Sequence, residues 1–525
     1  MEPNSVDQTT GDFTNRDHKK HFEQSLSRDL WNHFSINFAG RLARHALPNI
    51  NGFSDWDIFQ RYAHERHFDQ QRADSHRTAT MALQNLLQEI YGWRYSMSTA
   101  VRFQDALPIA KQFTKTHYEA LGQEPLILIR DLYGKIRLFL RGGPTEQHQD
   151  LAASLTQSLG NFAYPAEAIF LYETDFFNSQ SITGSPDKIL IPDTEPPIFL
   201  LDKQITSQDW LRQPIKGFGQ HPPRAVLFGI KGGVGRSSAL AIWARHLASL
   251  GKKVLVVDLD LESPGIGQIL LPQARLPDFG VVDWLVEEAV GQADRELLMD
   301  MVATSPLAGN TEGVIRVVTA AGGKEQDYIA KLSRVYMDIN QEGKIVDFAH
   351  RLAQLLQQLE AQEKPDIVLL DSRAGIHDIA AIAITRLTDM AFLFAINTPQ
   401  TWQAYRYLFS HWQKWNVNLS AFRNNLKIVA SMVPELGRED YLSRCRESAY
   451  NLFSETIYEE AEELEVFNFA LGDSSAPHFP VEILWNITFQ EFNPQSEDYF
   501  IINGAQLNAY YGNFLQTATE LVLGE

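Results

Sequence analysis

The chain of 525 residues has a single cysteine, Cys445, which excludes both a disulfide framework and a cysteine-based metal site. We expect Cys445 to be an inert core or surface thiol. No apolar run approaches the ~18 residues that a membrane-spanning helix needs. The first fifteen residues contain no basic residue and no apolar segment of the kind that a signal peptide has. These absences predict a cytoplasmic protein that has no membrane partner.

Basic residues are missing from one end of the chain. Residues 447–525 contain 14 Asp or Glu and no Lys or Arg, and most of the net charge of −19 lies there. A segment without cations is poorly suited to bind nucleic acid or anionic lipid, so nucleic acid is an unlikely partner. The helix expected at 505–523 either packs on the domain or docks a protein partner of basic character. The run 455–465 is typical of a solvated acidic helix face.

Length and composition predict two or three domains, with 44% hydrophobic and 21% charged residues. The predicted regions are a mainly helical N-terminal region (1–120), a small α+β module (121–200), a Pro-rich linker (201–223), an α/β core (224–445) and an acidic, helical C-terminal part packed on that core (446–525).

The module is predicted from a hairpin around Tyr133-Gly134-Lys135, a helix at about 146–160 and a strand at 168–172. Arg130, Lys135, Arg137 and Arg141 lie on or near the hairpin, either on a solvated sheet face or as a contact to RNA or DNA. The histidines of the N-terminal region have no metal-ligand spacing; they include His21, His33 and His67.

A glycine-rich segment, KGGVGRSS at 231–238, lies between an apolar strand pattern at 224–230 and a helix pattern at 239–250. Glycines let successive backbone N–H groups turn toward a phosphate, and the helix N-terminus adds partial positive charge. A hydroxyl at Ser237 is placed to ligate Mg²⁺. The expected nucleotide-binding residues of this loop are Gly232, Gly233, Val234, Gly235, Arg236, Ser237 and Ser238.

Carboxylates end two further strand patterns. The strand at 252–258 runs into Asp258-Leu259-Asp260, and the strand at 365–371 ends in Asp371. The carboxyl ends of parallel strands form the ligand crevice of an open α/β sheet, which makes Asp258 and Asp371 candidate metal ligands and Asp260 a candidate for positioning water. For Asp258, capping of the turn at Ser263-Pro264-Gly265 is the equal alternative.

Three more residues are expected at the same edge. Gly375 follows Asp371 closely enough for its N–H to reach a γ-phosphate. Asn397 and Pro434 follow strand patterns at 391–396 and 426–432 and are expected to bind the nucleotide; the end of the second strand, at Pro434, is where a nucleotide base is usually bound. The predicted fold class is α/β, with a mainly parallel sheet flanked by helices.

These motifs resemble the deviant-Walker-A ATPases of the MinD/ParA type, which belong to the SIMIBI class of P-loop NTPases. KGGVG (231–235), VLVVDLD (254–260), IVLLDSRAG (367–375) and LFAINTPQ (393–400) carry the resemblance. It implies that 224–445 is a P-loop ATPase core that uses ATP and Mg²⁺. It also implies that Lys231 reaches the phosphates of a partner subunit in a nucleotide-dependent homodimer.

The chain departs from that family at two positions. Arg236 stands at the P-loop lysine, and a planar guanidinium is not equivalent to an ammonium. Arg373 lies in Ser372-Arg373-Ala374-Gly375, where it acts either as an arginine finger or in a salt bridge to Asp378 or to an acidic partner surface. Both departures are similar to the KGGVGR-motif subgroup, which implies a setting in bacterial multi-gene conflict and antiviral defence loci.

The function predicted from these observations is an ATP- and Mg²⁺-dependent dimerising switch, with slow ATPase activity, that regulates an unidentified protein partner. The expected catalytic residues are Lys231, Arg236, Asp260 and Arg373. One alternative is a dimeric scaffold that binds ATP without hydrolysing it. The other is a nucleic-acid-binding regulator that acts through the N-terminal module.

Overall fold

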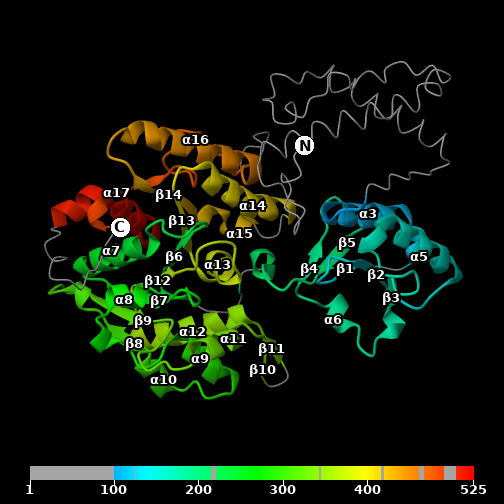
Figure 1. Cartoon of the computed structure of the whole chain (residues 1–525), viewed down its shortest axis with the longest axis horizontal. Helices are drawn as coiled ribbons and strands as arrows, with labels where there is room; N and C mark the ends of the chain where they lie inside the picture. Colours follow the sequence, from blue (N-terminus) through cyan, green and yellow to red (C-terminus); the bar gives the residue numbers. More distant parts are fainter. Residues whose placement is uncertain are drawn as a thin grey trace, which may run out of the picture. The chain divides into compact units, whose positions relative to one another are not determined.

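The computed structural model describes residues 100–122, 125–212, 215, 220–341, 344–415, 419–459, 466–489 and 504–524. The predictions for residues 1–99, including the three N-terminal histidines, lie outside these residues. The described chain forms two sheets of five and eight strands and a separate two-stranded hairpin. The larger sheet belongs to the α/β core, and the smaller sheet to the module that precedes it in sequence (Figure 1).

The module is an α+β unit with the strand order β3-β2-β1-β5-β4. Its strands are β1 (Leu126–Arg130), β2 (Ile136–Leu140), β3 (Phe170–Tyr172), β4 (Lys188–Leu190) and β5 (Ile198–Asp202). Its helices are α3 (Phe103–Thr116), α4 (Tyr118–Leu121), α5 (Glu146–Leu159) and α6 (Gln180–Thr183). The predicted hairpin is present as the antiparallel pair β1–β2, and the carboxylate of Asp131 accepts the backbone N–H groups of Tyr133 and Lys135 in its turn.

The boundaries of the module in the structure differ from those that the sequence pattern predicts. Helix α3 packs against α5 and β2, although the sequence analysis assigned it to the region before residue 121. Strand β5 pairs in parallel with β1 and so lies inside the sheet, although it extends beyond residue 200. Prolines such as those around β4 and β5 are typical of a linker. The pairing of β5 with β1 depends on contacts that are distant in sequence, and the local proline pattern does not indicate them.

The predicted linker also contributes to the core of the next domain. Residues Gln208–Leu211 form a 3₁₀ turn, η6, in which Trp210 is 2% exposed. The Trp210 ring packs against Phe228 and Trp412, with ring centroids 6.4 and 5.8 Å apart. Part of the linker is therefore fixed to the α/β core by a buried aromatic side chain.

The eight-stranded sheet has the order β15-β14-β13-β6-β12-β7-β9-β8, and all neighbours are parallel except β8 and β9. Its strands are β6 (Arg224–Gly229), β7 (Lys253–Asp258), β8 (Val302–Thr304), β9 (Val314–Val318), β12 (Ile367–Asp371), β13 (Met390–Ala395), β14 (Leu426–Val433) and β15 (Val481–Leu484). The α/β prediction with a mainly parallel sheet is confirmed. Strand β6, the first in sequence, lies between β12 and β13, which is a topological switch point of the kind where α/β sheets bind ligands.

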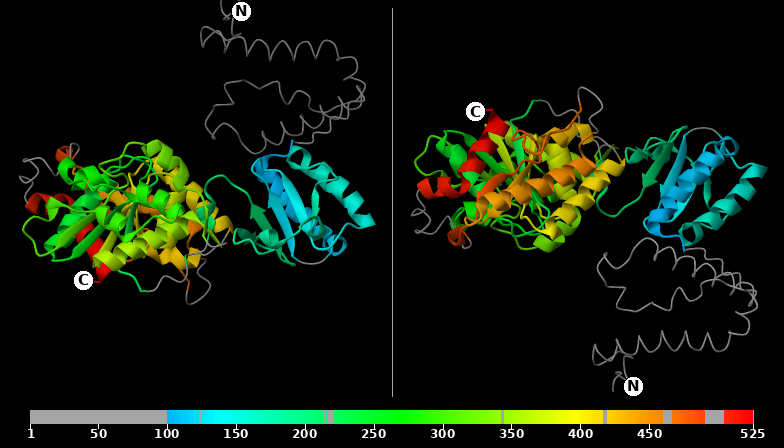
Figure 2. Two further views of the ribbon diagram at one scale, coloured as in Figure 1. Left: turned by 90° about the horizontal axis from the view of Figure 1, so that it is seen from below. Right: turned by 90° about the horizontal axis from the view of Figure 1, so that it is seen from above.

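Helices cover both faces of this sheet (Figure 2). Alternate side chains of β6 enter two different cores: Val226 and Phe228 pack with α12, α13 and α14, whereas Ala225 and Leu227 pack with α7 and α17. Since a strand buried on both faces needs apolar residues at every position, the continuous apolar run 225–228 is explained.

The helices of this domain are α7 (Arg236–Ser249), α8 (Ile266–Leu270), α9 (Val281–Ala289), α10 (Arg295–Asp300), α11 (Tyr328–Val335), α12 (Phe348–Glu363), α13 (Asp378–Ile382), α14 (Pro399–Trp415), α15 (Leu419–Phe422), α16 (Arg438–Thr456) and α17 (Gly504–Leu523). The hairpin of β10 (Ile339–Gln341) and β11 (Lys344–Val346) lies between α11 and α12 in sequence. A π-helical turn, η9 (Ala383–Leu387), directly follows α13.

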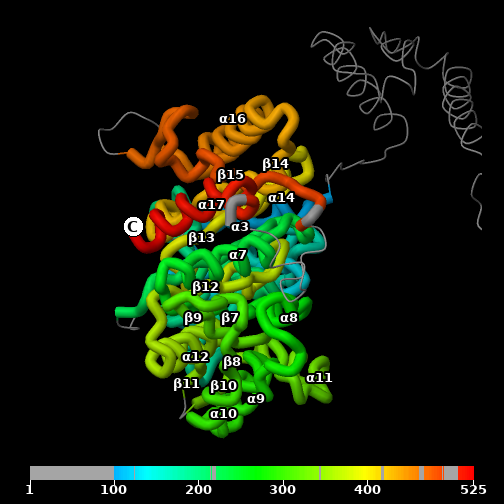
Figure 3. Tube along the Cα trace, turned by 90° about the vertical axis from the view of Figure 1, so that its left-hand side faces the viewer, coloured from blue at the N-terminus to red at the C-terminus, as the bar shows by residue number. Residues whose placement is uncertain are grey.

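The C-terminal part is integrated into the domain and is not helical throughout. Strand β15 extends the sheet beside β14, and α17 packs on α7 and β15 (Figure 3). Phe514 is fully buried, and the indole N–H of Trp243 donates to the Thr519 hydroxyl at 3.1 Å. The alternative in which the last helix packs on the domain is the arrangement that the structure shows.

Two smaller expectations concern the same region. An acidic helix is predicted at 455–465, but helix α16 ends at Thr456 and residues 457–459 are not helical. Residues 460–465 lie outside the described residues. Cys445 is buried, and burial raises the pKa of its thiol to about 12, as expected for an inert core thiol. Within the described part of the chain, every helix is too short or too polar to cross a membrane.

Candidate functional site

The glycine-rich loop joins the end of β6 to the first turn of α7. Gly233 and Gly235 have φ of +72° and +80°, which is the left-handed region that L side chains rarely adopt. Lys231 is exposed, whereas Val234 is buried. The loop therefore opens outward at the N-terminus of a 14-residue helix, where backbone N–H groups without helical partners are suited to bind an anion.

Arg236 is the first residue of α7 and is 8% exposed. Its guanidinium donates to the Ser372 carbonyl, and Nη2 lies 3.9 Å from Oδ2 of Asp260. A Cβ at Gly229 would lie 3.1 Å from Cδ of Arg236, so glycine at 229 leaves room for this side chain. The structure thus brings Arg236 together with Asp260 and with the segment after β12, and a phosphate must compete with these acceptors for the guanidinium.

Ser237 and Asp371 meet beside the loop. The Ser237 hydroxyl donates to Oδ2 of Asp371 at 2.8 Å, and the other oxygen, Oδ1, is buried with no hydrogen-bond partner among the described residues. Burial raises the pKa of Asp371, and the nearby Arg236 opposes that rise. A hydroxyl and an unpaired carboxylate oxygen form a hard donor set that fits Mg²⁺.

A fully protein-made metal cage is absent from the part of the chain that the structure describes, where no three His, Cys, Asp or Glu side chains are grouped to hold a metal ion. Mg²⁺ in nucleotide sites is usually held by only one or two protein groups, together with phosphates and water. Ser237 and Asp371 are consistent with that partial donor set.

Asp258 lies in register with Asp371 on the neighbouring strand and is 1% exposed. Its two oxygens accept the backbone N–H groups of Asp260, at 3.0 Å, and of Gly265, at 3.3 Å. Burial, and next the Asp371 carboxylate, raise the pKa of Asp258 well above its usual value. Of the two roles considered for Asp258, the geometry shows the turn cap, and its role as a metal ligand stays a prediction.

Asp260 is 9% exposed, and its Oδ2 lies 3.9 Å from Nη2 of Arg236. Burial raises its pKa, while Arg236 and then Arg373 lower it. Its Oδ1 atom is buried and accepts no hydrogen bond from the described residues. An unpaired carboxylate oxygen beside a phosphate loop is chemically able to hold a water molecule, which is the role predicted for Asp260.

Residues 372–377 form the switch segment, which joins Asp371 to α13. Arg373 pairs with Glu262 at 2.6 Å, and not with Asp378 as the sequence analysis considered. Glu262 also lies 3.2 Å from Nε2 of His377 and accepts the Tyr336 hydroxyl. Sequence reasoning missed Glu262, because its position two residues after Asp260 says nothing about Tyr336, which lies just after the distant helix α11.

The N–H group of Gly375 is already engaged. It donates to the Gly229 carbonyl at 3.0 Å, and Gly375 has a φ of +88°. To reach a γ-phosphate, as predicted, this N–H must leave the strand that carries the glycine loop. The site therefore contains a hydrogen bond that would differ between two arrangements of the switch segment.

Asn397 and Pro434 follow the adjacent strands β13 and β14, as expected. The backbone N–H of Asn397 donates to the Tyr441 hydroxyl at 2.8 Å, and its side-chain oxygen accepts the Trp402 indole N–H at 2.7 Å. The bond from Trp402 holds the Asn397 side chain against α14. Contacts of Asn397 and Pro434 with a base stay predictions.

The basic residues of the module are largely engaged within it. Arg130 forms a buried pair with Asp202, with Nε 2.8 Å from Oδ1, and Arg137 lies over the Tyr164 ring at 3.4 Å. Neither side chain is a solvated cation of the kind expected on an open nucleic-acid-binding face. The expectation that nucleic acid is not a partner stays a prediction.

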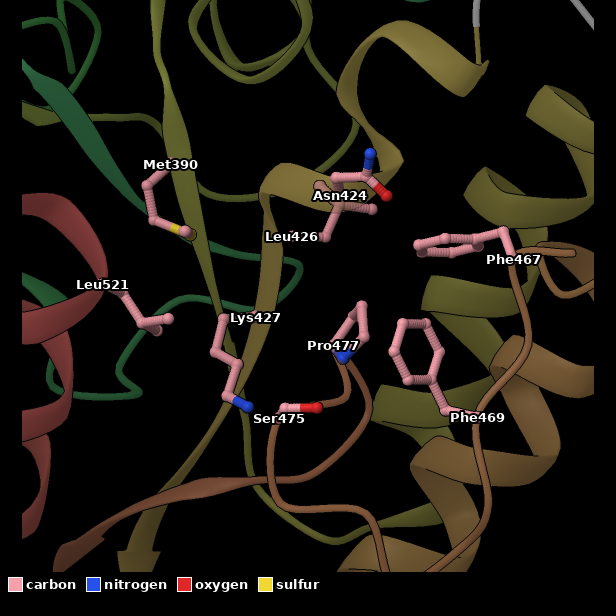
Figure 4. A pocket seen from close by; sticks show the side chains of 9 residues that line it. All are labelled: Met390, Asn424, Leu426, Lys427, Phe467, Phe469, Ser475, Pro477 and Leu521. Atoms are coloured by element: carbon pink, nitrogen blue, oxygen red, sulfur yellow. The ribbon is translucent and has the colours of Figure 1, made fainter. Parts of the chain in front are cut away.

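A cavity of about 230 Å³ lies near the first residues of β14 (Figure 4). The glycine loop, by contrast, follows the carboxyl end of β6. The cavity is lined by Met390, Asn424, Leu426, Lys427, Phe467, Phe469, Ser475, Pro477 and Leu521. The Lys427 ammonium donates to the carbonyls of Ala476 at 2.8 Å and Ser474 at 3.1 Å. Burial lowers the pKa of Lys427 to about 8.

Comparison of the sequence with protein-family models finds no match, and comparison with curated proteins finds none either. Solved structures with a similar course of the backbone include ParA of pNOB8 bound to nonspecific DNA, with 13% identity, a TM-score of 0.37 and coverage of 58% of this chain and 98% of that one. A ParA family ATPase from Chlorobium tepidum TLS has 14% identity, a TM-score of 0.36 and coverage of 56% and 98%. The MinC:MinD cell division complex from Aquifex aeolicus has 16% identity, a TM-score of 0.37 and coverage of 58% and 96%. All three are distant similarities.

Proposed function

We propose that this chain binds ATP with Mg²⁺ at the loop between β6 and α7, dimerises through the bound nucleotide and acts as a slow ATPase switch for a protein partner. The observation that carries the proposal is the contact of Ser237 with Asp371, 2.8 Å apart, at the N-terminus of α7. A helix N-terminus, a hydroxyl and an unpaired buried carboxylate oxygen together suit a magnesium-bound phosphate chain.

Each part of the site has a proposed task. The backbone N–H groups of 232–237 hold the phosphates, and Ser237 and Asp371 are the residues that would hold Mg²⁺, which neutralises phosphate charge when bound. Asp260 orients the attacking water. Lys231, which is exposed on the loop, extends to the nucleotide of a second copy of the chain.

The two arginines support a slow reaction. Arg236 donates to the Ser372 carbonyl and Arg373 pairs with Glu262, so each guanidinium has to exchange a protein acceptor for a phosphate oxygen. The same observation favours a second candidate function, in which the chain is an ATP-bound dimeric scaffold that does not hydrolyse its nucleotide. A setting in bacterial antiviral defence remains part of the proposal and is supported by the KGGVGR resemblance alone.

Single-turnover hydrolysis and sizing by light scattering, in ATP, in ADP and without nucleotide, test the proposal. We expect ATP-induced dimers and slow phosphate release, both lost in Lys231→Ala. Lys344→Ala, which removes an exposed cation from the β11 hairpin, is the matched control and retains both. Tight ATP binding without phosphate release supports the scaffold instead, and absence of ATP binding refutes both functions.

A further inference from the structure

Residues 207–212, here named the relay segment, lie against the helix that follows the switch segment. Helix α13, which begins at Asp378, packs against the 3₁₀ turn η6 of the relay segment. Asp209, 7% exposed, accepts a hydrogen bond from Nη1 of Arg386 at 2.8 Å, and Arg386 belongs to the π-helical turn that continues α13. The relay segment is thus packed against one end of the helical stretch 378–387 and hydrogen-bonded to the other.

The same segment is anchored near the glycine loop. The Trp210 ring packs against Phe228, which lies in β6 just before the loop, and against Trp412 of α14. The charges beside it are buried as well, since the Arg386 side chain is 4% exposed. Separating a buried charge from its partner is strongly unfavourable, so a shift of 378–387 moves the relay segment with it.

The switch segment supplies the connection to the nucleotide site. The Gly375 N–H donates to the Gly229 carbonyl, and two residues later the His377 side chain accepts the Ile379 N–H at 3.4 Å at the start of α13. If Gly375 turns to a γ-phosphate, its bond to Gly229 breaks. The adjoining residues 377 and 378 then change position, or the packing of α13 against the relay segment is strained.

At its other end the relay segment meets the module. Nε of Arg212 lies 2.9 Å from the Asp187 carboxylate, next to β4, while Nη1 lies 3.4 Å from Asp209 and 3.6 Å from Asp347. Arg386 shares Asp209 and Asp347 with Arg212. One network of charges therefore joins the helix after the switch segment to the module that precedes it in sequence.

We propose that the relay segment transmits the nucleotide state of the site to the small α+β module, which it contacts through Asp187. The inference rests on the proposed ATP-dependent switch and specifies its route: the signal leaves through 207–212, and not through the acidic C-terminal part. Two sites coupled through such an element typically influence each other by about 5- to 150-fold.

Hydrogen exchange of the full chain, with and without ATPγS and Mg²⁺, tests the relay. In the wild type we expect the exchange rate of residues 203–212 to change by about fivefold or more, together with changes at 231–238 and 372–377. Asp209→Asn, which weakens the pair with Arg386 and preserves side-chain shape, retains the change at 231–238 and reduces that at 203–212 to less than about twofold. Asp294→Ala is the control: it removes a helix cap from α10, where Asp294 accepts the Leu297 N–H at 2.9 Å, and retains both changes.

Three results would overturn the relay. One is a wild type in which 231–238 and 372–377 respond to nucleotide while 203–212 does not. Another is a response of 466–489 and 504–524 in place of 203–212, which assigns the signal to the C-terminal part. If 231–238 itself does not respond, the proposed nucleotide binding fails and the relay fails with it. Arg386→Gln, which removes the cation of the same pair, replaces Asp209→Asn if that variant does not fold.

Discussion

Replacement of Arg236 by lysine tests whether the arginine is built into the site. The guanidinium donates to the Ser372 carbonyl and lies 3.9 Å from Asp260, so one side chain links the loop to two other segments. Lysine has the same charge but a single nitrogen on a shorter side chain, and it cannot serve both acceptors with the same geometry. We expect Arg236→Lys to release Ser372 while leaving the charge of the site unchanged.

The magnitude follows from the lost hydrogen bond. A hydrogen bond from a charged donor contributes about 1.5–3 kcal/mol, and the Ser372 carbonyl belongs to a residue that is fully buried. A loss of about 2 kcal/mol lowers the melting temperature of a domain of roughly 300 residues by about 3 °C. Arg316→Lys is the control: Arg316 also pairs with a carboxylate, that of Glu363 at 2.7 Å, but at a more exposed position, so we expect a loss below about 1 kcal/mol.

Differential scanning fluorimetry gives the stability, and sizing in ATP gives the functional consequence. We expect the Arg236→Lys dimer to be weaker than the wild-type dimer and hydrolysis to be no faster. A melting temperature within about 1 °C of the wild type, with an unchanged dimer and equal or faster hydrolysis, would refute the reasoning. Arginine would then be merely tolerated at a lysine position.

Three further predictions concern single residues. Because burial raises the pKa of Asp371, the charge of its carboxylate destabilises the fold at neutral pH. Asp371→Asn should abolish Mg²⁺-dependent nucleotide binding yet stabilise the protein by about 1–2 kcal/mol at pH 7.5. Thermal scans should show that this stabilisation vanishes toward pH 4. Burial lowers the pKa of Lys427 to about 8, so the buried ammonium destabilises the fold fully below pH 8, and this destabilisation disappears as the pH rises toward 10.5. The melting temperature of the wild type should therefore rise relative to that of Lys427→Met between pH 7 and pH 10. Gly375→Ala places a side chain at a φ of +88°, which strains the backbone by about 1–2 kcal/mol and should weaken the hydrogen bond from residue 375 to Gly229. We expect faster hydrogen exchange at 372–377 without nucleotide, and an unchanged exchange rate would contradict this prediction.

Much of the candidate site was predictable from local sequence. Glycines between an apolar strand and a helix predict an anion-binding loop, and an aspartate that ends a buried strand predicts a carboxylate at the same edge. The contact of Ser237 with Asp371 follows from those two patterns once the strands are adjacent and parallel. Glu262 was not predictable, since its partners Arg373, His377 and Tyr336 belong to segments far from it in the sequence, and no local pattern indicates that they meet.

The larger sheet shows the same division. Its apolar strand runs determined the α/β class and the central strands by themselves, because a strand buried on both faces needs apolar residues at successive positions. Tertiary structure alone decided that Pro-flanked residues form β5 inside the small sheet, that 481–484 extends the large one, and that Trp210 of the expected linker belongs to the core. It also decided that Arg236 is directed to Ser372. Strand pairing, burial and side-chain direction at these places depend on partners far away in the sequence, which no local pattern encodes.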